Sequence, residues 1–395
     1  MRPTREFDED LGDAGKIGAI HAHLKALLLD NKLRPGQRRT GGRQAGSRTM
    51  RAVMAGLLVS LAWAPTAWTQ TSASPVPPAP TGPITIEKQG SFFIGGRDVH
   101  SDDLSTLPAY APAGTITVDQ MYVHFQVPAG GAAATPVVLI HGCCLTGKTW
   151  ETTPDGRMGW AEYFVRKGLP TYVIDQVWRG RSAGDPSGVN AVRKGAPIDK
   201  LPAVFSASHE AAWAIFRFGA AYPQTFPDLQ FPVEAQAEFW KQMVPDYLAS
   251  LPTPNPTVPA LSTLAQKLGG AVLLSHSQSG IYPFQTAVLD TKGIAGIISV
   301  EPGACPEATD DMTPYKGIPI LVLFGDYVDQ FPRWAPRLKG CRAFIDKVNA
   351  AGGHASLIVL PDRGIRGNSH MLMQDRNNLQ VADILLDWMR TDVKR

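Results

Sequence analysis

Six short, almost wholly apolar runs constrain the fold of this 395-residue chain more than any other feature of the sequence. They are PVVLIHG, PTYVIDQV, GAVLLSHS, AGIISVEP, IPILVLFGD and HASLIVLPD. A strand that is apolar on both faces is typical of a parallel sheet covered by helices on both sides. The runs therefore predict the strands of such a sheet.

Segments of helical period separate these runs, among them GWAEYFVRKG, SHEAAWAIFRFG, IYPFQTAVLD, LKGCRAFIDKVNAAGG and NLQVADILLDWMR. Two earlier segments, Ser91–Gly96 and Met121–Pro128, are bounded by Gly and Pro and predict antiparallel strands. Strands that alternate with helices predict an α/β fold with a mostly parallel central sheet flanked by helices. In such a fold, ligands bind at the carboxyl ends of the strands.

An insertion interrupts the alternation at about residues 183–265, with Pro-rich, aromatic sequence such as AYPQTFPDLQFPVEAQ. We expect this insertion to form a cap over the site, and a peripheral insertion is the alternative. Aromatic residues in and before it would then supply apolar surface near the site, unless they belong to the core: Trp150, Trp160, Trp178, Trp213, Trp240, Phe231 and Phe239.

The N-terminal part of the chain differs from the rest in composition. Ala52 to Ala64, AVMAGLLVSLAWA, is an uncharged, mostly apolar run with a basic flank before it and small polar residues after it. It is shorter than the roughly 20 residues of a bilayer span, and the pattern is typical of a secretory signal. A core helix or a membrane anchor is the alternative. We expect an upstream segment outside the fold at 1–49, a signal peptide at 50–70, a linker at 71–89 and one domain at 90–395.

Such a signal predicts an exported protein, periplasmic or secreted, without stable membrane insertion. The net charge of +3 comes from the first 51 residues, so the remainder is slightly acidic and does not favour nucleic acid as a partner. The four cysteines form no CxxC pair, which in an exported protein favours disulfides over metal ligands. No cofactor or metal is expected, because FIGGRD is not a dinucleotide fingerprint and the histidines lack metal-ligand spacing.

Three serines at alternate positions lie in LLSHSQSGIY, Leu273 to Tyr282. Ser277 stands where an apolar run ends and a helical segment begins, which is the strand-turn-helix setting of a nucleophile elbow. The turn requires small residues two positions before and after the nucleophile, and Ser275 and Ser279 occupy these places. We therefore predict Ser277 as the nucleophile, although G-x-S-x-G lacks both of its glycines here.

A serine nucleophile needs a base, and the base needs an acid that holds its tautomer. His370 lies in the loop after the last predicted strand, where the chain order serine, acid, histidine places the base. His354 begins that strand and His276 adjoins the nucleophile, so both are weaker candidates. For the acid, Glu301 and Asp326 end consecutive predicted strands, and the pattern leaves the two nearly level.

Two N–H donors must stabilise the oxyanion, one from Gln278 after the nucleophile and one from the loop HGCCLTG. Consecutive Cα atoms are about 3.8 Å apart, closer than in ordinary disulfides. We hypothesise that Cys143 and Cys144 are nevertheless bonded, which would lock the peptide between them and fix an oxyanion-hole N–H. Two reduced thiols are the alternative. Cys305 and Cys341 are then available for a second, ordinary bridge.

Together, HGCCLTG, DQVWRGRS, SHSQSG, SVEPG and GNSHMLMQD resemble the α/β-hydrolase superfamily from about Gly90 to the C-terminus. More narrowly, the chain resembles exported bacterial serine esterases with an adjacent-cysteine disulfide beside the oxyanion hole. This resemblance implies a catalytic triad of Ser277, His370 and Glu301, and so favours Glu301 over Asp326. It also implies that the two adjacent cysteines are bridged.

The sequence therefore predicts a serine carboxylesterase that acts through an acyl-enzyme on small to medium apolar esters. An amidase, a lactonase or a polyester hydrolase would use the same residues. A non-catalytic binding protein on the α/β-hydrolase fold is the alternative from another class. The predicted partner is a small-molecule ester, and a homodimer is the assembly considered.

Overall fold

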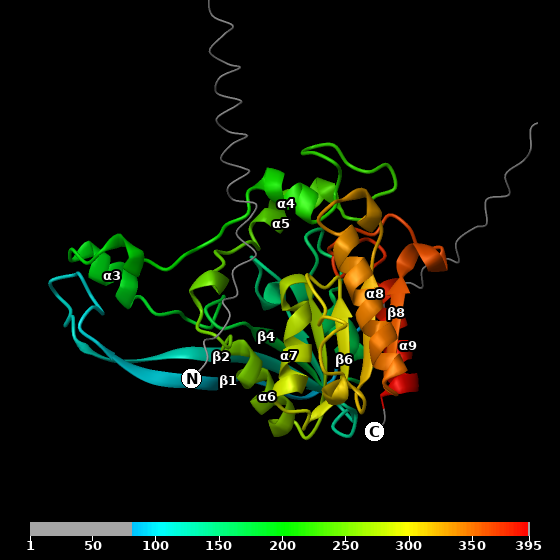
Figure 1. Cartoon of the computed structure of the whole chain (residues 1–395), viewed down its shortest axis with the longest axis horizontal. Coiled ribbons are helices and arrows are strands. Elements are labelled where there is room, and N and C mark those ends of the chain that lie inside the picture. The colour runs from blue at the N-terminus through cyan, green and yellow to red at the C-terminus, as the bar shows by residue number, and fades with distance from the viewer. Residues whose placement is uncertain (1–80, 394–395) are drawn as a thin grey trace, which may run out of the picture. The chain divides into compact units, whose positions relative to one another are not determined.

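The six apolar runs form the parallel part of one eight-stranded sheet (Figure 1). The structure, a computed structural model, describes residues 81–393, so the predicted segments 1–49 and 50–70 lie outside the described residues. The strand order is β1-β2-β4-β3-β5-β6-β7-β8. The strands are β1 (Ile86–Ser101), β2 (Gly114–Pro128), β3 (Val137–Ile140), β4 (Thr171–Asp175), β5 (Ala271–His276), β6 (Ile294–Val300), β7 (Pro319–Phe324) and β8 (His354–Val359).

Alternate residues of the parallel strands enter two separate cores, which explains why these strands are apolar throughout. In β5, Leu273 packs in one core and Leu274 in the other. The first core lies under α6 (Thr257–Lys267), α7 (Tyr282–Leu289) and α8 (Ala335–Ala350). The second lies under α2 (Trp160–Arg166), α4 (His209–Ile215), α5 (Gln236–Trp240) and α9 (Asn378–Asp392). Within residues 81–393, no helix combines the length and hydropathy needed to cross a bilayer.

The antiparallel hairpin at the start of the domain is longer than the sequence predicted. β1 and β2 pair from Ile86 opposite Pro128 to Ser101 opposite Gly114. β1 therefore begins inside the range 71–89 that was predicted as a linker. The polar residues that alternate along β1 hid this part of the strand, because one face of β1 is largely exposed.

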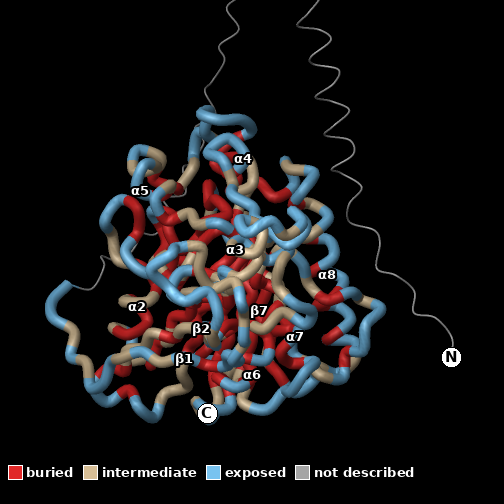
Figure 2. The backbone as a smooth tube through the Cα atoms, turned by 90° about the vertical axis from the view of Figure 1, so that its left-hand side faces the viewer, coloured by how far each residue is buried: buried red, intermediate tan, exposed pale blue. Residues whose placement is uncertain are grey.

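The insertion contains short helices and loops rather than further strands of the sheet. Its helix α3 (Ser187–Arg193) buries no residue, and Figure 2 shows it in the colours of exposed and intermediate residues. Figure 1 shows α4 and α5 beyond one end of the strands. The helix α6 was predicted to belong partly to the insertion, but its residues Val258, Leu261 and Leu264 pack in the first core. The part of the insertion that leaves the sheet therefore ends before Thr257.

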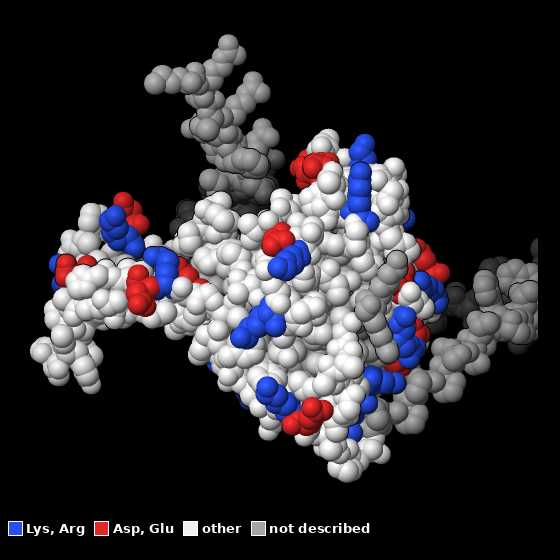
Figure 3. Space-filling model, turned by 90° about the horizontal axis from the view of Figure 1, so that it is seen from below, with Lys and Arg blue, Asp and Glu red and all other residues white. Residues whose placement is uncertain are grey.

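On the face shown in Figure 3, basic and acidic side chains are interspersed over a largely uncharged surface. Among the charged residues of the described part of the chain, Lys194 pairs with Asp103, and their Nζ and Oδ1 atoms are 2.6 Å apart.

Candidate active site

Three side chains from separate parts of the chain meet at the carboxyl ends of the strands. Ser277 follows β5, Glu301 follows β6, and His370 lies in the loop between β8 and α9. The Nε2 atom of His370 is 2.8 Å from Ser277 Oγ, and its Nδ1 atom is 3.0 Å from Glu301 Oε2. The structure thus brings together the three residues that the sequence analysis selected.

Ser277 occupies a tight turn. Its φ of 57° lies in the left-handed region, which is uncommon for a residue with a side chain. A Cβ atom added at Gly280 would lie 2.6 Å from Pro302 Cα, and one added at Gly142 would lie 2.8 Å from Ser277 Cβ. Two neighbouring loops therefore approach the turn so closely that only glycine fits at these positions.

The two serines in place of the elbow glycines are buried and hydrogen-bonded. Ser279 Oγ is 3.1 Å from the carbonyl oxygen of Ile140 and also accepts the backbone N–H of His276. Ser275 Oγ donates to the carbonyl oxygen of Ile298 at 3.4 Å. A buried hydroxyl is tolerated when it finds a partner. Besides being small, these serines therefore tie the turn to the strands on either side.

Glu301 rather than Asp326 contacts the histidine. Glu301 is fully buried, accepts two hydrogen bonds from the guanidinium of Arg217, and accepts the N–H of Gly325. Burial would raise the pKa of Glu301, but the charge of Arg217 and the contact with His370 outweigh it and lower the pKa to about 2. Asp326 instead accepts the N–H of Gly367 at 2.9 Å and supports the histidine loop.

The imidazole of His370 is enclosed by aromatic rings. It stacks on Phe216 at a centroid distance of 5.8 Å and lies 4.3 Å from the ring of Trp334. Burial and the charge of Arg217 lower the pKa of His370 to about 4, although Glu301 acts in the opposite direction. The ring is therefore held neutral near pH 7, as a general base requires.

The two other histidine candidates do not reach Ser277 Oγ with a hydrogen bond in the described part of the chain. His276 Nε2 lies 2.9 Å from the carbonyl oxygen of His370, so it supports the backbone of the loop. His354 pairs with Asp392 at 2.5 Å, on the C-terminal helix.

The adjacent cysteines form a disulfide-bonded turn directly after Gly142, the residue that closely approaches Ser277. Cys143 and Cys144 are bonded to each other, and the φ of Cys144 is 61°. The carbonyl oxygen of Cys144 accepts the N–H of Val244 at 2.9 Å, which connects the turn to the insertion. The sulfurs and a carboxylate oxygen of Asp246 lie within 4.8 Å of one another, but bonded sulfurs offer no thiolate to a metal.

The second pair, Cys305 and Cys341, is also bonded, with Cα atoms 5.1 Å apart. This bridge connects the segment after Glu301 to α8. It has the ordinary Cα separation of a protein disulfide.

Five of the seven aromatic residues considered for the site belong to the core: Trp150, Trp160, Trp213, Phe231 and Phe239. Trp178 and Trp240 are partly buried and pack against the two cores. The aromatic rings at His370 are instead those of Phe216 and Trp334, which the sequence analysis did not select.

Sequence reasoning also missed Arg217, which follows α4 in the insertion. Its signal was a single arginine between two phenylalanines in an otherwise apolar segment, WAIFRFG. Arginine is seldom fully buried unless it is paired, so a charged partner inside the protein was to be expected. The sequence pattern around Arg217 does not indicate which carboxylate is its partner.

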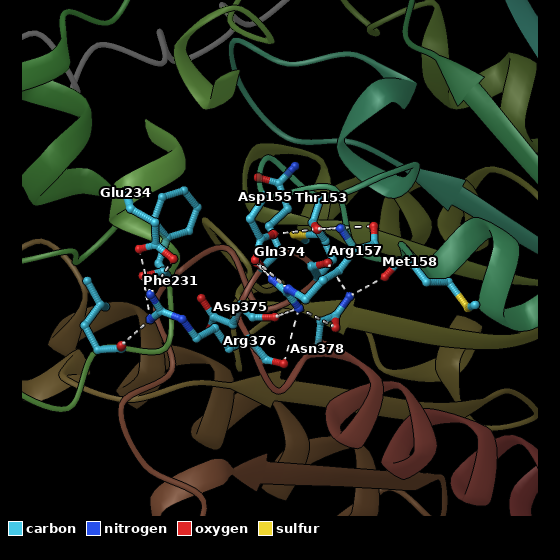
Figure 4. Close-up of polar contacts among 12 residues, drawn as sticks. Thr153, Asp155, Arg157, Met158, Phe231, Glu234, Gln374, Asp375, Arg376 and Asn378 are labelled. Carbon is cyan, nitrogen blue, oxygen red and sulfur yellow. Dashed lines mark hydrogen bonds and ion pairs between the residues drawn. The ribbon is translucent and has the colours of Figure 1, made fainter. Parts of the chain in front are cut away.

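A polar network holds the segment that follows the loop with His370. Figure 4 shows Arg157 at its centre, and its guanidinium donates to the carbonyl oxygens of Gln374, Asp375 and Arg376. The Asp375 carboxylate accepts the hydroxyl of Ser369 at 2.7 Å, one residue before His370. Burial raises the pKa of Asp375 to about 7. These contacts fasten the loop that contains His370 and the segment that follows it.

Two comparisons with known proteins found similar chains. No family model matches the chain. A solved structure described as a novel bacterial esterase is 65% identical, covers 81% of this chain and 100% of its own, and superposes with a TM-score of 0.79. A curated protein, the probable secreted lipase phiG of Fungal sp. (strain ATCC 74256), is 26% identical over 321 residues, which are 68% of this chain and 85% of that protein.

The mostly parallel sheet, the flanking helices and the close structural match define an α/β-hydrolase, so the predicted fold is confirmed. Within that superfamily, the chain belongs to the family of the bacterial esterase, as identity and coverage establish. It is therefore an enzyme of the carboxylic ester hydrolase class.

Proposed function

We propose that this protein hydrolyses carboxylic esters through an acyl-enzyme formed on Ser277. One observation carries the proposal: the hydrogen-bonded series from Ser277 Oγ to His370 Nε2, and from His370 Nδ1 to Glu301 Oε2, with distances of 2.8 and 3.0 Å. This is the arrangement of nucleophile, base and orienting acid that serine hydrolysis requires.

In the acylation step, Ser277 Oγ attacks the ester carbonyl carbon and His370 Nε2 takes the hydroxyl proton. Glu301 accepts the Nδ1–H of the ring, which keeps Nε2 free to act as the base. The tetrahedral intermediate then expels the alcohol, which receives the proton from His370. Water then attacks the acyl-enzyme, and His370 takes the proton of the water and returns it to Ser277 Oγ. The carboxylic acid product leaves, and Ser277 is free again.

The oxyanion is held in this proposal by the N–H of Gln278 and by that of Cys143 or Cys144. The approach of Gly142 to Ser277 Cβ supports this assignment, because it brings the disulfide-bonded turn against the nucleophile. Backbone donors fixed before the reaction stabilise the developing charge without reorganisation.

Reduction of the Cys143–Cys144 bond is expected to lower kcat by about 10²- to 10³-fold, the usual effect of losing one oxyanion donor. The matching variant is Cys143→Ala/Cys144→Ala, assayed with a soluble activated ester. The control is Cys305→Ala/Cys341→Ala, which removes the other bridge. It is expected to lower stability by about 2–4 kcal/mol and to leave kcat nearly unchanged. Full activity of the first variant would exclude the role of the turn.

The substrate is proposed to be a small to medium apolar ester. Ser277 is 8% exposed, and aromatic rings flank its base, so the reacting group must enter an enclosed, apolar environment. Esters with short acyl chains and apolar alcohols suit such a site. A panel of matched esters, amides, lactones and polyester films separates this proposal from the amidase, lactonase and polyester hydrolase alternatives.

The mechanism is tested with a fluorophosphonate probe on the oxidised protein, followed by peptide mass spectrometry. A covalent adduct on Ser277 that is absent in His370→Ala supports an activated serine. Folded, oxidised protein that gives no adduct would contradict the acyl-enzyme and would favour a non-catalytic protein of this fold.

We also propose that the protein is exported to the periplasm or the medium. The two disulfides support this, because such bonds persist in oxidising compartments. The curated relative is named as secreted. Cell fractionation of the producing bacterium, followed by N-terminal sequencing of the mature protein, tests both export and the cleavage site within 50–70.

A further inference from the structure

The insertion contributes a fully buried cation to the centre of the site. Arg217 has no exposed surface, and its guanidinium donates to both oxygens of Glu301, with Nη1 2.8 Å from Oε2. Its Nε–H donates to the carbonyl oxygen of Asp326, with a distance of 2.8 Å between the two heavy atoms. A planar guanidinium fits a carboxylate in this two-point manner, which fixes orientation as well as charge.

We propose that Arg217 is a positioning residue of the active site: it orients Glu301 and keeps the Glu301–His370 pair free of an extra proton under acidic conditions. This inference rests on the triad proposed above. Its consequence is an esterase that remains active at a pH where an ordinary histidine would be protonated.

The backbone just before Arg217 is anchored by two hydrogen bonds. The carbonyl oxygen of Ile215 accepts the indole N–H of Trp334 at 3.0 Å, and that of Phe216 accepts the N–H of His370 at 2.9 Å. The φ of Arg217 is 56°, a left-handed conformation that is unfavourable for a residue with a side chain. The surrounding contacts therefore enforce a backbone conformation that arginine does not favour by itself.

Charge explains why the site needs this residue. A buried carboxylate without a partner is strongly disfavoured, and one cation balances one carboxylate here. Nη1 of Arg217 also lies 3.5 Å from His370 Nδ1, so its charge opposes protonation of the ring. The titratable and charged groups that act on His370 include Glu301 after β6, Arg217 in the insertion, His276 in β5 and Arg333 before α8. The buried carboxyl of Asp375, beside the histidine loop, interacts with the charge of Glu301.

The pair of Glu301 and His370 titrates as a unit. With Arg217 present, an ionised Glu301 and a neutral His370 give a neutral centre. Without Arg217, the same state carries one uncompensated negative charge, so the pair binds a proton more readily. The base is lost when the pair is protonated, and activity therefore disappears at a higher pH.

The experiment measures kcat/KM against pH for the wild type, Arg217→Met and Arg217→Lys, using an ester assay whose signal is independent of pH. Fluorophosphonate titration gives the concentration of reactive Ser277 in each sample. The acid limb is the part of the profile in which kcat/KM falls as the pH is lowered. Removing the charge in Arg217→Met is expected to move the midpoint of this limb up by about one pH unit or more, and to lower kcat with little change in KM. Arg217→Lys keeps the charge but not the two-point contact, so its limb should stay near that of the wild type while kcat falls.

A matched control is Arg179→Met. Arg179 is 3% exposed and pairs with Asp246 of the insertion, so it is also a buried arginine in an ion pair with a carboxylate. It makes no hydrogen bond to Glu301 or His370 among those of residues 81–393. Its loss is expected to affect stability but to leave the acid limb in place.

The outcomes separate this inference from the proposed function. A wild type that neither hydrolyses esters nor reacts at Ser277 overturns the triad. An active, labelled wild type whose acid limb is unchanged in Arg217→Met overturns only the role of Arg217. The role of Arg217 is also overturned if the acid limb of Arg179→Met or of Arg217→Lys moves as far as that of Arg217→Met. If Arg217→Met does not fold, the wild type still decides: an acid limb at or above about 6.5, the ordinary histidine value, contradicts the inference.

Discussion

Ser277→Ala is expected to lower kcat by about 10⁵- to 10⁶-fold, because no other group in the proposed mechanism can form the acyl-enzyme. The small activity that remains would come from substrate binding and the oxyanion donors. The measurement is the hydrolysis of an activated ester at high enzyme concentration, combined with fluorophosphonate labelling. Ser277→Ala is expected to give no adduct.

The control for this variant is Ser275→Ala, two residues earlier in β5. Ser275 is buried like Ser277, but its hydroxyl has only a long hydrogen bond of 3.4 Å to Ile298, so its loss should leave kcat within a few-fold. Comparable activity of Ser277→Ala and the wild type, with an adduct on another serine, would show that the nucleophile is elsewhere.

Glu301→Gln is expected to lower kcat by about 10⁴-fold, the effect of replacing a triad acid by its amide. The amide presents no charge to the imidazolium that forms during catalysis, and it favours the wrong tautomer of His370. It also leaves Arg217 buried without its carboxylate, so stability should fall as well. The rate must therefore be expressed per labelled site, and folding checked by circular dichroism.

Asp326→Asn is the matched comparison. The Asp326 carboxylate accepts the N–H of Gly367 and of Tyr327, and an amide oxygen can replace part of this. A loss of about tenfold or less is expected, through a looser His370 loop. If Asp326→Asn abolished turnover while Glu301→Gln kept it, the acid would have to be reassigned.

The sheet could be predicted because each of its strands carries the signal locally. Burial on both faces makes Val272, Leu273 and Leu274 apolar, and no distant contact is needed to recognise the strand. The start of β1 was missed for the complementary reason. Its exposed positions are polar, so the sequence of β1 alone does not indicate a strand here. The pairing of Lys88 with Val127 depends on contact with β2.

The sequence could predict the site residues that follow predicted strands. It could not predict the residues that the insertion contributes to the site. Ser277, Glu301 and His370 follow strands or lie in a loop of defined chain order, whereas Arg217 follows a short helix in irregular sequence. Pattern alone could not decide between Glu301 and Asp326, because each ends a predicted strand. In the structure, the φ of 52° at Glu301 accompanies the turn of its carboxylate towards the histidine. The sequence alone does not indicate such a backbone conformation.

The contacts between the insertion and the sheet also determine how this enzyme can be recombined with its relatives. The insertion supplies Arg217 to Glu301, the Phe216 carbonyl to His370 and the Val244 N–H to the cysteine turn. It is therefore not an interchangeable module. A chimera that replaces it as a block would remove a counterion from one side of the site and a backbone support from the other, so substrate range is better altered in the loops between these anchors.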